Sequence, residues 1–131
     1  MASLNTFITA IQTRIATLAD RVYYGDVIPP TEYIPYVVWK YTTTADVEDL
    51  QDFFIEVTAT DNGPDATRIE NTTDAINGDG DKTCPTGLHR WHYGSGGSPT
   101  FRMFLINRIQ LPSMDENMVR RQLRYRVRVY L

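Results

Sequence analysis

The first eighteen residues carry apolar side chains at the spacing of an amphipathic helix. Steps of one to four residues separate the members of a single stripe, which are Leu4, Phe7, Ile8, Ile11, Ile15 and Leu18. This repeat fits a period of 3.6 residues, and the opposite positions hold mostly Thr and Gln. Ser3 precedes the stripe and is a suitable N-cap, because its hydroxyl accepts a backbone N–H of the first turn. The pattern predicts a helix that begins at Leu4.

After Pro29 and Pro30 the pattern becomes that of strands. Residues 34–42 are rich in β-branched and aromatic side chains. Residues 53–60 alternate, with one predicted face formed by Phe53, Ile55, Val57 and Ala59. An acidic connection joins the two segments, so a hairpin is expected. A short extended piece around Val22 offers one further strand.

A second helix is predicted over residues 64–77. Pro64 stands at its first position and acids occupy its first turn, both of which are favoured there. The expected inward-facing residues are Ala66, Ile69, Thr73 and Ile76. Gly78 is placed to end the helix, since glycine readily adopts the left-handed conformation of a C-terminal stop.

Three more strands, over residues 88–93, 101–111 and 119–131, complete the predicted order α-β-β-α-β-β-β. Strands that follow one another through short turns favour antiparallel pairing. We therefore expect a single domain over residues 1–131 with an α+β fold. Its β-sheet is mixed and mainly antiparallel, and the two helices pack on one face.

Several predicted strands carry apolar side chains on both faces. Val37 stands beside Val38, Phe53 beside Phe54, and a third set contains Met103, Phe104, Leu105, Ile106 and Ile109. Two helices cover only one face of such a sheet. The second face must be covered either by a further β layer of the same chain or by another copy of the chain, and the sequence leaves both alternatives open.

Composition narrows the class of protein. The chain has 131 residues, of which 42% are hydrophobic and 22% charged, enough for a core without disulfides or a structural metal. A long apolar run is absent from the sequence, so no membrane span is expected. The N-terminal segment lacks a signal-peptide pattern. A single cysteine, Cys84, excludes an internal disulfide and fits a reducing cytoplasm.

The net charge of −3 conceals two opposed blocks. Residues 46–81 carry eleven acids and one base, whereas residues 82–131 carry nine bases and two acids. In the last predicted strand Arg124, Arg126 and Arg128 alternate with apolar residues and line one face.

Three readings of this arginine row stay open. The first is a solvated face whose charge protects the sheet. The second is contact with phosphates. The third is docking on acids of a neighbouring copy, in a head-to-tail contact that closes into a ring, and the acids concerned are Asp46, Glu48, Asp49 and Asp52.

Catalytic and metal-binding motifs are weak. His89 and His92 would fall on opposite faces of a strand, and with Cys84 they do not converge on a zinc ion. The sequence that begins at Asn77 resembles a calcium loop but has Leu88 where that loop needs a bidentate Glu. Nucleophile-elbow and phosphate-loop motifs are absent from the sequence. We therefore expect that the protein is not an enzyme, that it has no catalytic residues, and that it binds neither a cofactor nor a metal.

One stretch resembles a known family. Arg21-Val22-Tyr23, then Pro29-Pro30, then the segment Ile34-Pro35-Tyr36-Val37-Val38-Trp39 is similar to the start of the tail terminator and tail completion (neck) proteins of long-tailed bacteriophages. Length and α+β order agree over nearly the whole chain. The segment 78–99 and the dense C-terminal arginines have no counterpart in the family pattern, so their roles are inferred from the residues alone.

The resemblance implies a structural virion protein of the tail or neck, assembled in the host cytoplasm. Such a protein forms a ring, commonly a hexamer, which caps the tail tube and ends its polymerisation. Its implied partners are further copies of itself, the tail tube protein, the head connector (stopper) protein and the genomic DNA that passes through the lumen without sequence-specific binding. A membrane is not among them.

Three hypotheses follow for this chain. The subunit interface would use Arg124, Arg126, Arg128, Phe104 and Ile106. The acids of residues 46–52 would either join that interface or face the channel, where negative walls keep DNA from sticking. A docking loop would contain Gly94, Ser95, Gly96 and Gly97. The alternatives are a head-side connector, either a stopper or an adaptor, and a small cytoplasmic domain that binds nucleic acid or a ligand.

Overall fold

The computed structural model describes residues 4–19, 21–25, 35–43, 53–62, 66–81, 85–93, 100–112 and 118–130. The described elements are, in chain order, α1 (Leu4–Leu18), β1 (Val22–Tyr24), β2 (Tyr36–Thr43), β3 (Phe53–Asn62), α2 (Thr67–Asn77), β4 (His92–Tyr93), β5 (Thr100–Leu111) and β6 (Met118–Tyr130). The fold is α+β, as the sequence predicts, and the piece around Val22 supplies the additional strand. Neither α1 nor α2 combines the length and the apolar character that a membrane crossing requires.

All the described strands belong to one sheet in the order β1-β2-β3-β6-β5-β4. The pair β1–β2 is parallel and the other neighbours are antiparallel. The predicted hairpin of β2 and β3 is confirmed, with Trp39 opposite Val57. The last strand, β6, lies between β3 and β5 rather than at an edge. Two long strands from opposite halves of the chain therefore form the centre of the sheet.

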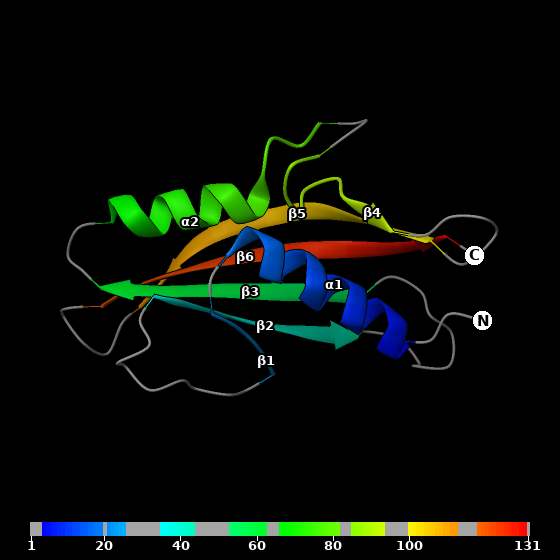
Figure 1. Cartoon of the computed structure of the whole chain (residues 1–131), viewed down its shortest axis with the longest axis horizontal. Coiled ribbons are helices and arrows are strands. Elements are labelled where there is room, and N and C mark those ends of the chain that lie inside the picture. The colour runs from blue at the N-terminus through cyan, green and yellow to red at the C-terminus, as the bar shows by residue number, and fades with distance from the viewer. Residues whose placement is uncertain are drawn as a thin grey trace.

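Both helices cover the same face of this sheet, with α1 crossing the strands obliquely and α2 running along them (Figure 1). The apolar stripe of α1 buries Phe7, Ile11 and Ile15 completely. The ring of Phe7 meets that of Phe101 edge-on with 5.0 Å between the centroids. Complete burial of each such side chain contributes about 1.5–3 kcal/mol, so this stripe is a main source of the stability of α1.

Polar side chains join each helix to the sheet. The indole of Trp39, which is fully buried, donates a hydrogen bond to the side-chain oxygen of Gln12 on α1. On α2, Asn77 accepts a hydrogen bond of 2.9 Å from the hydroxyl of Tyr125 on β6. Burial raises the pKa of Tyr125 well above its ordinary value, although the charge of Arg108 opposes the shift. The hydroxyl therefore keeps the proton that it donates.

The start of α2 differs from the prediction. Pro64 lies outside the described residues, and the helix begins at Thr67 after Ala66. The later start follows from Ala66, whose φ of −91° and ψ of 3° lie outside the helical range and place it before the first helical residue. The predicted inward face is confirmed, since Ile69, Thr73 and Ile76 are buried and Ala66 packs against the core. The N-cap residue Ser3, predicted for α1, is likewise outside the described residues.

The strand predicted over residues 88–93 is only two residues long. Arg90 has a φ of +66°, a left-handed conformation that interrupts regular pairing. The chain around it still bonds to β5, because Arg90 N donates to Met103 O at 2.7 Å and Met103 N to Trp91 O at 2.9 Å. The prediction of a regular strand was therefore wrong in length, although it was right in placing this segment beside the sheet.

Two glycines pack against each other where the chain leaves α2. Gly78 ends the helix, as predicted, with a φ of +76°. A Cβ atom added to Gly78 would lie 2.2 Å from Gly87 N, and one added to Gly87 would lie 2.4 Å from Ile76 O. Leu88 N donates to Ile76 O at 2.8 Å across this contact. The close approach holds the segment around Gly87 against the end of α2.

We predict that Gly78→Ala lowers the free energy of unfolding by about 3 kcal/mol, because it combines backbone strain with a backbone clash. Gly25→Ala is the matched control. Gly25 also has a positive φ, of +96°, but a Cβ there meets open space. Gly25→Ala should lower the free energy of unfolding by about 1 kcal/mol, because it adds the backbone strain without the clash. Urea unfolding of both variants measures the difference, and equal losses would contradict the packing argument.

Candidate functional site

The face of the sheet that α1 and α2 leave uncovered is called the open face here. The strand register places its side chains in rows across β5, β6, β3 and β2. The first row contains Phe104, Arg126, Phe54 and Thr42, the second Asn107, Arg124, Glu56 and Lys40, and the third Ile109, Gln122, Thr58 and Val38. All the described strands belong to the one sheet, so the described residues include no second β layer over this face.

The open face is basic. Its described side chains include six bases, Lys40, Arg102, Arg120, Arg124, Arg126 and Arg128, and one acid, Glu56. The carboxylate of Glu56 lies 3.7 Å from Arg124 Nε and 3.9 Å from Lys40 Nζ, so one acid serves two cations. The guanidinium side chains also offer planar pairs of donors that match carboxylates or phosphates.

Aromatic side chains stand among these charges. Phe54 and Phe104 are half-buried and flank Arg126 on either side in the register. Ile109 is 39% exposed on the same face. Arginine with aromatic neighbours is the composition that protein interfaces favour. Among the described residues, this surface has the chemistry to bind an acidic partner that also offers apolar contact.

The residues predicted for the subunit interface are largely brought together. Arg124, Arg126, Arg128 and Phe104 share the open face. Ile106 lies at the edge of it, at an irregularity where β5 shifts register between Leu105 and Asn107, and it is 47% exposed. The predicted interface or channel acids (Asp46, Glu48, Asp49 and Asp52) and the docking loop (Gly94, Ser95, Gly96 and Gly97) lie outside the described residues.

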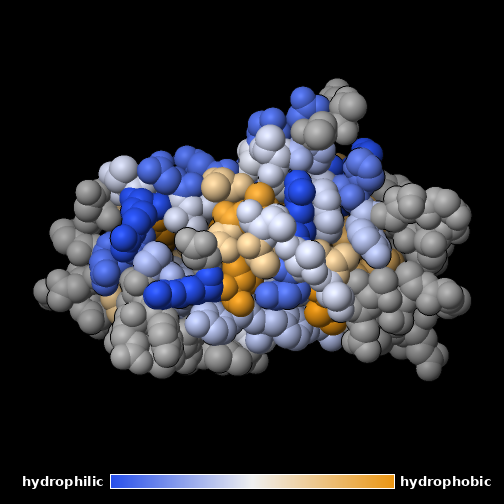
Figure 2. All heavy atoms as spheres, in the orientation of Figure 1, coloured by the Kyte–Doolittle hydropathy of each residue, from blue (hydrophilic) through white to orange (hydrophobic). Residues whose placement is uncertain are grey.

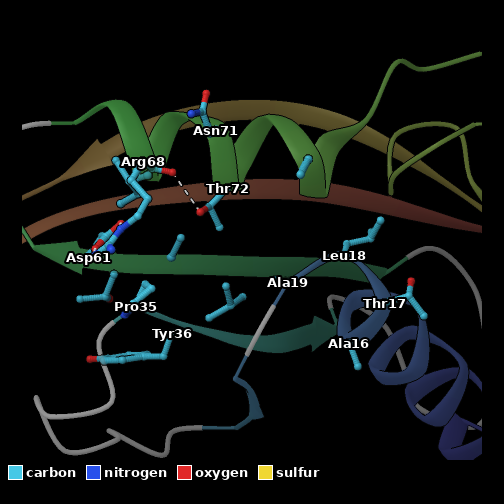
Figure 3. Close-up of a pocket in the computed structure, with 15 residues that line it drawn as sticks. Ala16, Thr17, Leu18, Ala19, Pro35, Tyr36, Asp61, Arg68, Asn71 and Thr72 are labelled. Atoms are coloured by element: carbon cyan, nitrogen blue, oxygen red, sulfur yellow. Dashed lines mark hydrogen bonds and ion pairs between the residues drawn. The ribbon is translucent and has the colours of Figure 1, made fainter.

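A groove on the helix side is a second candidate. It has a volume of about 390 Å³ and lies between the end of α1, α2 and the adjoining ends of β2 and β3. Figure 2 shows an apolar patch in the centre of this side of the molecule. In Figure 3 Leu18 and Ala19 stand on one side of the groove and Arg68 on the other, while Asn71 points away from it.

The charged pair in this groove is structural. Arg68 Nε donates to Asp61 Oδ2 at 2.7 Å and its Nη2 donates to Oδ1, so the contact is bidentate (Figure 3). Burial alone would raise the pKa of Asp61, but the hydrogen bonds from Arg68 and from the Asn62 N–H outweigh it and lower that pKa. The carboxylate is therefore charged and paired, and it ties the end of β3 to the first turn of α2.

The sequence alone did not reveal this pair. Asp61 and Arg68 are seven residues apart, on different elements, and such spacing has no local pattern. The signal that exists is indirect: an acid at the end of an alternating strand, followed by a base in the first turn of the next helix.

The side chains that could bind a metal form hydrogen bonds with the backbone or lie apart from one another. His89 Nδ1 accepts a hydrogen bond of 3.0 Å from the Leu105 N–H. Asp79 Oδ1 accepts backbone N–H groups of Asp81 and Thr86 and so closes its own turn. Within the described ranges no three His, Cys, Asp or Glu side chains converge on a point that would hold a metal ion. Cys84 lies outside those ranges.

Comparison with known proteins does not assign the chain to a family. Neither the protein-family models nor the curated protein sequences with which the chain was compared match it. The class of the molecule is therefore defined by its own geometry: an α+β domain whose sheet has helices on one face and a basic, partly aromatic surface on the other.

We predict that stability falls as the pH drops below the ordinary His pKa of about 6.5. Burial, with the charge of Arg90, lowers the pKa of His89. The folded protein therefore binds fewer protons than the unfolded chain in this range, and the hydrogen bond from Leu105 needs the neutral ring.

His89→Asn keeps an acceptor that does not titrate, so it should reduce the loss of unfolding free energy between pH 7.5 and 5.5. His92→Asn, at an exposed position on β4, is the control and should leave that loss unchanged. Urea unfolding at the two pH values makes the comparison. If His89→Asn loses as much unfolding free energy between the two pH values as the unaltered protein, the loss does not come from His89.

Proposed function

We propose that this protein is a non-enzymatic structural subunit that assembles into a ring and serves as a tail terminator or tail completion protein of a long-tailed bacteriophage. The observation that carries the proposal is the open face, where arginines alternate with the buried residues of β6 and stand beside Phe54 and Phe104. Such a surface suits burial against another protein rather than catalysis.

Charge determines how two copies can meet on this face. Pairing two open faces directly would bring six bases against six bases, with one acid on each side. Like charges at an interface oppose binding by several kcal/mol. The open face must therefore meet a different, acidic surface of the next copy. Such a head-to-tail contact is heterologous, and it closes into a ring when its rotation permits.

The acids of residues 46–52 are the proposed partner surface. They stand in the sequence between β2 and β3. The first residue of β3, Phe53, pairs with Val127, which Arg126 and Arg128 flank in the sequence. The competing assignment places the same acids on the channel wall. Both assignments are part of the same proposal of a ring, and they differ in what removal of the charges does to assembly.

The other partners rest on the family resemblance at Arg21-Val22-Tyr23 and the proline-tyrosine strand. They are the tail tube protein, the head connector (stopper) protein and the DNA in the lumen, and the implied location is the virion tail or neck. The docking role of residues 94–97 does not rest on the resemblance and is inferred from their glycine-rich sequence. A head-side stopper or adaptor is the alternative in the same setting. Binding to purified tail tubes rather than to the portal assembly distinguishes the two.

The native mass of the purified protein tests the ring directly. The expected species has a mass of about 90 kDa, six times the chain mass of 15.0 kDa. Within this experiment, Arg126→Glu should weaken assembly by about tenfold or more, because it sets an acid against the proposed acidic partner. Light scattering over a concentration range measures both.

Arg90→Glu is the matched control, since it makes the same change of charge outside the sheet face. It should assemble like the unaltered protein. Equal assembly of all three proteins would remove the open face from the ring contact. A monomer at every concentration, without assembly on added tail tubes, would overturn the ring. Salt-sensitive binding of such a monomer to DNA would then favour the nucleic-acid-binding alternative, in which the six bases contact phosphates.

Neutralising three acids separates the two assignments of the β2–β3 connection. In the triple variant Asp46→Asn, Glu48→Gln and Asp49→Asn, assembly should weaken about as much as in Arg126→Glu, because both variants remove the same charge attraction. Unchanged assembly would assign these acids to the channel instead. Light scattering at low and high salt gives the measurement, and the difference between the variants and the unaltered protein should shrink at high salt.

A further inference from the structure

The outer edge of β5 is covered over only half its length by described residues. β4 pairs with Phe101 and Arg102, the segment before it bonds to Met103, and His89 accepts the N–H of Leu105. On its inner side β5 stays paired with β6 as far as Leu111. Across residues 106–111, no described strand pairs with the outer side.

This uncovered edge carries apolar side chains. The large hydrophobic residues that stand exposed in the described part of the chain are Ile106, Ile109 and Tyr24, at 47%, 39% and 41%. Two of the three lie on residues 106–111 of β5. An open strand edge with exposed apolar side chains is a template for the addition of another strand.

Charge does not protect the edge. The one ionisable residue of this stretch, Arg108, turns toward α2, where it bonds to Asp74 at 2.7 Å and to Glu70 at 2.8 Å. Natural proteins often place lysine or proline on free edges, and residues 106–111 contain neither. Pro112 follows directly after this stretch. The irregularity next to Ile106 is the single protective feature, and it lies at the start of the stretch.

The third exposed hydrophobic residue marks the opposite edge of the same sheet. Tyr24 lies on β1, which is outermost beside β2. The carbonyl of Arg21 and the N–H of Gly25 bond toward β2, so the backbone groups of Val22 and Tyr24 between them point away from the sheet. Exposed apolar residues thus gather at the two edges of one sheet, as they would if the edges covered each other in neighbouring copies.

We infer that residues 106–111 of β5 receive the β1 edge of a second copy of this chain, which continues the sheet from one subunit into the next. The inference deepens the proposed function and rests on it, because it requires an assembly of identical copies. The contact uses the two edges of the sheet and leaves the open face accessible, so the charge contact on that face can coexist with it. It joins different edges and is therefore head-to-tail, as a ring requires.

Cysteine pairs test the contact in the full-length protein with Cys84→Ser as background. Asn107, Ile109 and Leu111 share the open-face side of β5, and Tyr23 lies on the same side of β1. Each of the variants Asn107→Cys, Ile109→Cys and Leu111→Cys is mixed with a tagged Tyr23→Cys chain and oxidised. Opposed cysteines on neighbouring strands lie within disulfide reach.

The control mixes Thr58→Cys with the tagged Tyr23→Cys chain, since Thr58 faces the same side from the central strand β3. At least one β5 position should give a mixed disulfide in at least tenfold higher yield than this control. The native mass of every variant is recorded under reducing conditions, so a variant that fails to assemble is recognised. Amide hydrogen exchange of the unaltered protein provides a measurement without substitutions: residues 22–24 and 106–111 should gain protection on assembly.

The outcomes separate this inference from the proposed function. A species of about 90 kDa without mixed disulfides and without new protection would overturn the edge contact while the ring stands. An Ile109→Cys disulfide between two identical chains would show two-fold pairing of β5 with itself and would also overturn it. A monomer at every concentration would overturn both. Mixed disulfides together with protection at both edges support the continuous sheet.

Discussion

The alternation along β6 is the constraint on which the rest of the structure depends. Leu123, Tyr125 and Val127 are fully buried beneath the helices. Arg124, Arg126 and Arg128 alternate with them and point to the opposite face. A slip of one residue in its pairing would exchange the two sets and bury three guanidinium groups without partners, at a cost of several kcal/mol each. The register of β6 against β3 and β5 is therefore strongly fixed, and with it both the core and the basic surface.

The helix side uses its charges differently from the open side. Arg108 and Arg121 reach Glu70 under α2, and Asp61 holds Arg68, so bases and acids there are matched within the chain. On the open face one acid, Glu56, stands among six described bases. The difference is one of placement, because α2 carries Glu70 and Asp74 on the helix side, where they meet Arg108 and Arg121. The fold thus pairs part of the acidic block of the sequence with part of the basic block and leaves the arginine row of β6 on the opposite face.

Local patterns in the sequence predicted the elements well where a single period persists. The stripe of α1, the alternation of β3 and the arginine row of β6 all reappear in the structure, because each follows from the period of one element. The predicted beginning of α2 and the predicted length of β4 were wrong, because Ala66 and Arg90 adopt backbone conformations that interrupt the regular element. The Asp61–Arg68 pair and the free edge of β5 were not predicted at all. The edge depends on the order of strands in the sheet, and the pair depends on how the first turn of α2 packs beside the end of β3. A periodic pattern within one element encodes neither.

The basic open face and the unpaired strand edges of the sheet favour the same kind of assembly. The open face cannot meet itself because its charge repels. Among the described residues, β5 has a longer stretch of unpaired edge and β1 a shorter one. A face that rejects its own copy excludes the two-fold arrangement in which open faces stack. Unequal edges that both expose apolar side chains favour contact between unlike edges, since the short β1 edge covers part of what β5 leaves open. An identical heterologous contact repeats the same rotation from copy to copy, and it closes into a ring when that rotation permits. The charge of the open face and the unequal edges thus favour a head-to-tail contact over a two-fold dimer, independently of the family that the opening segment resembles.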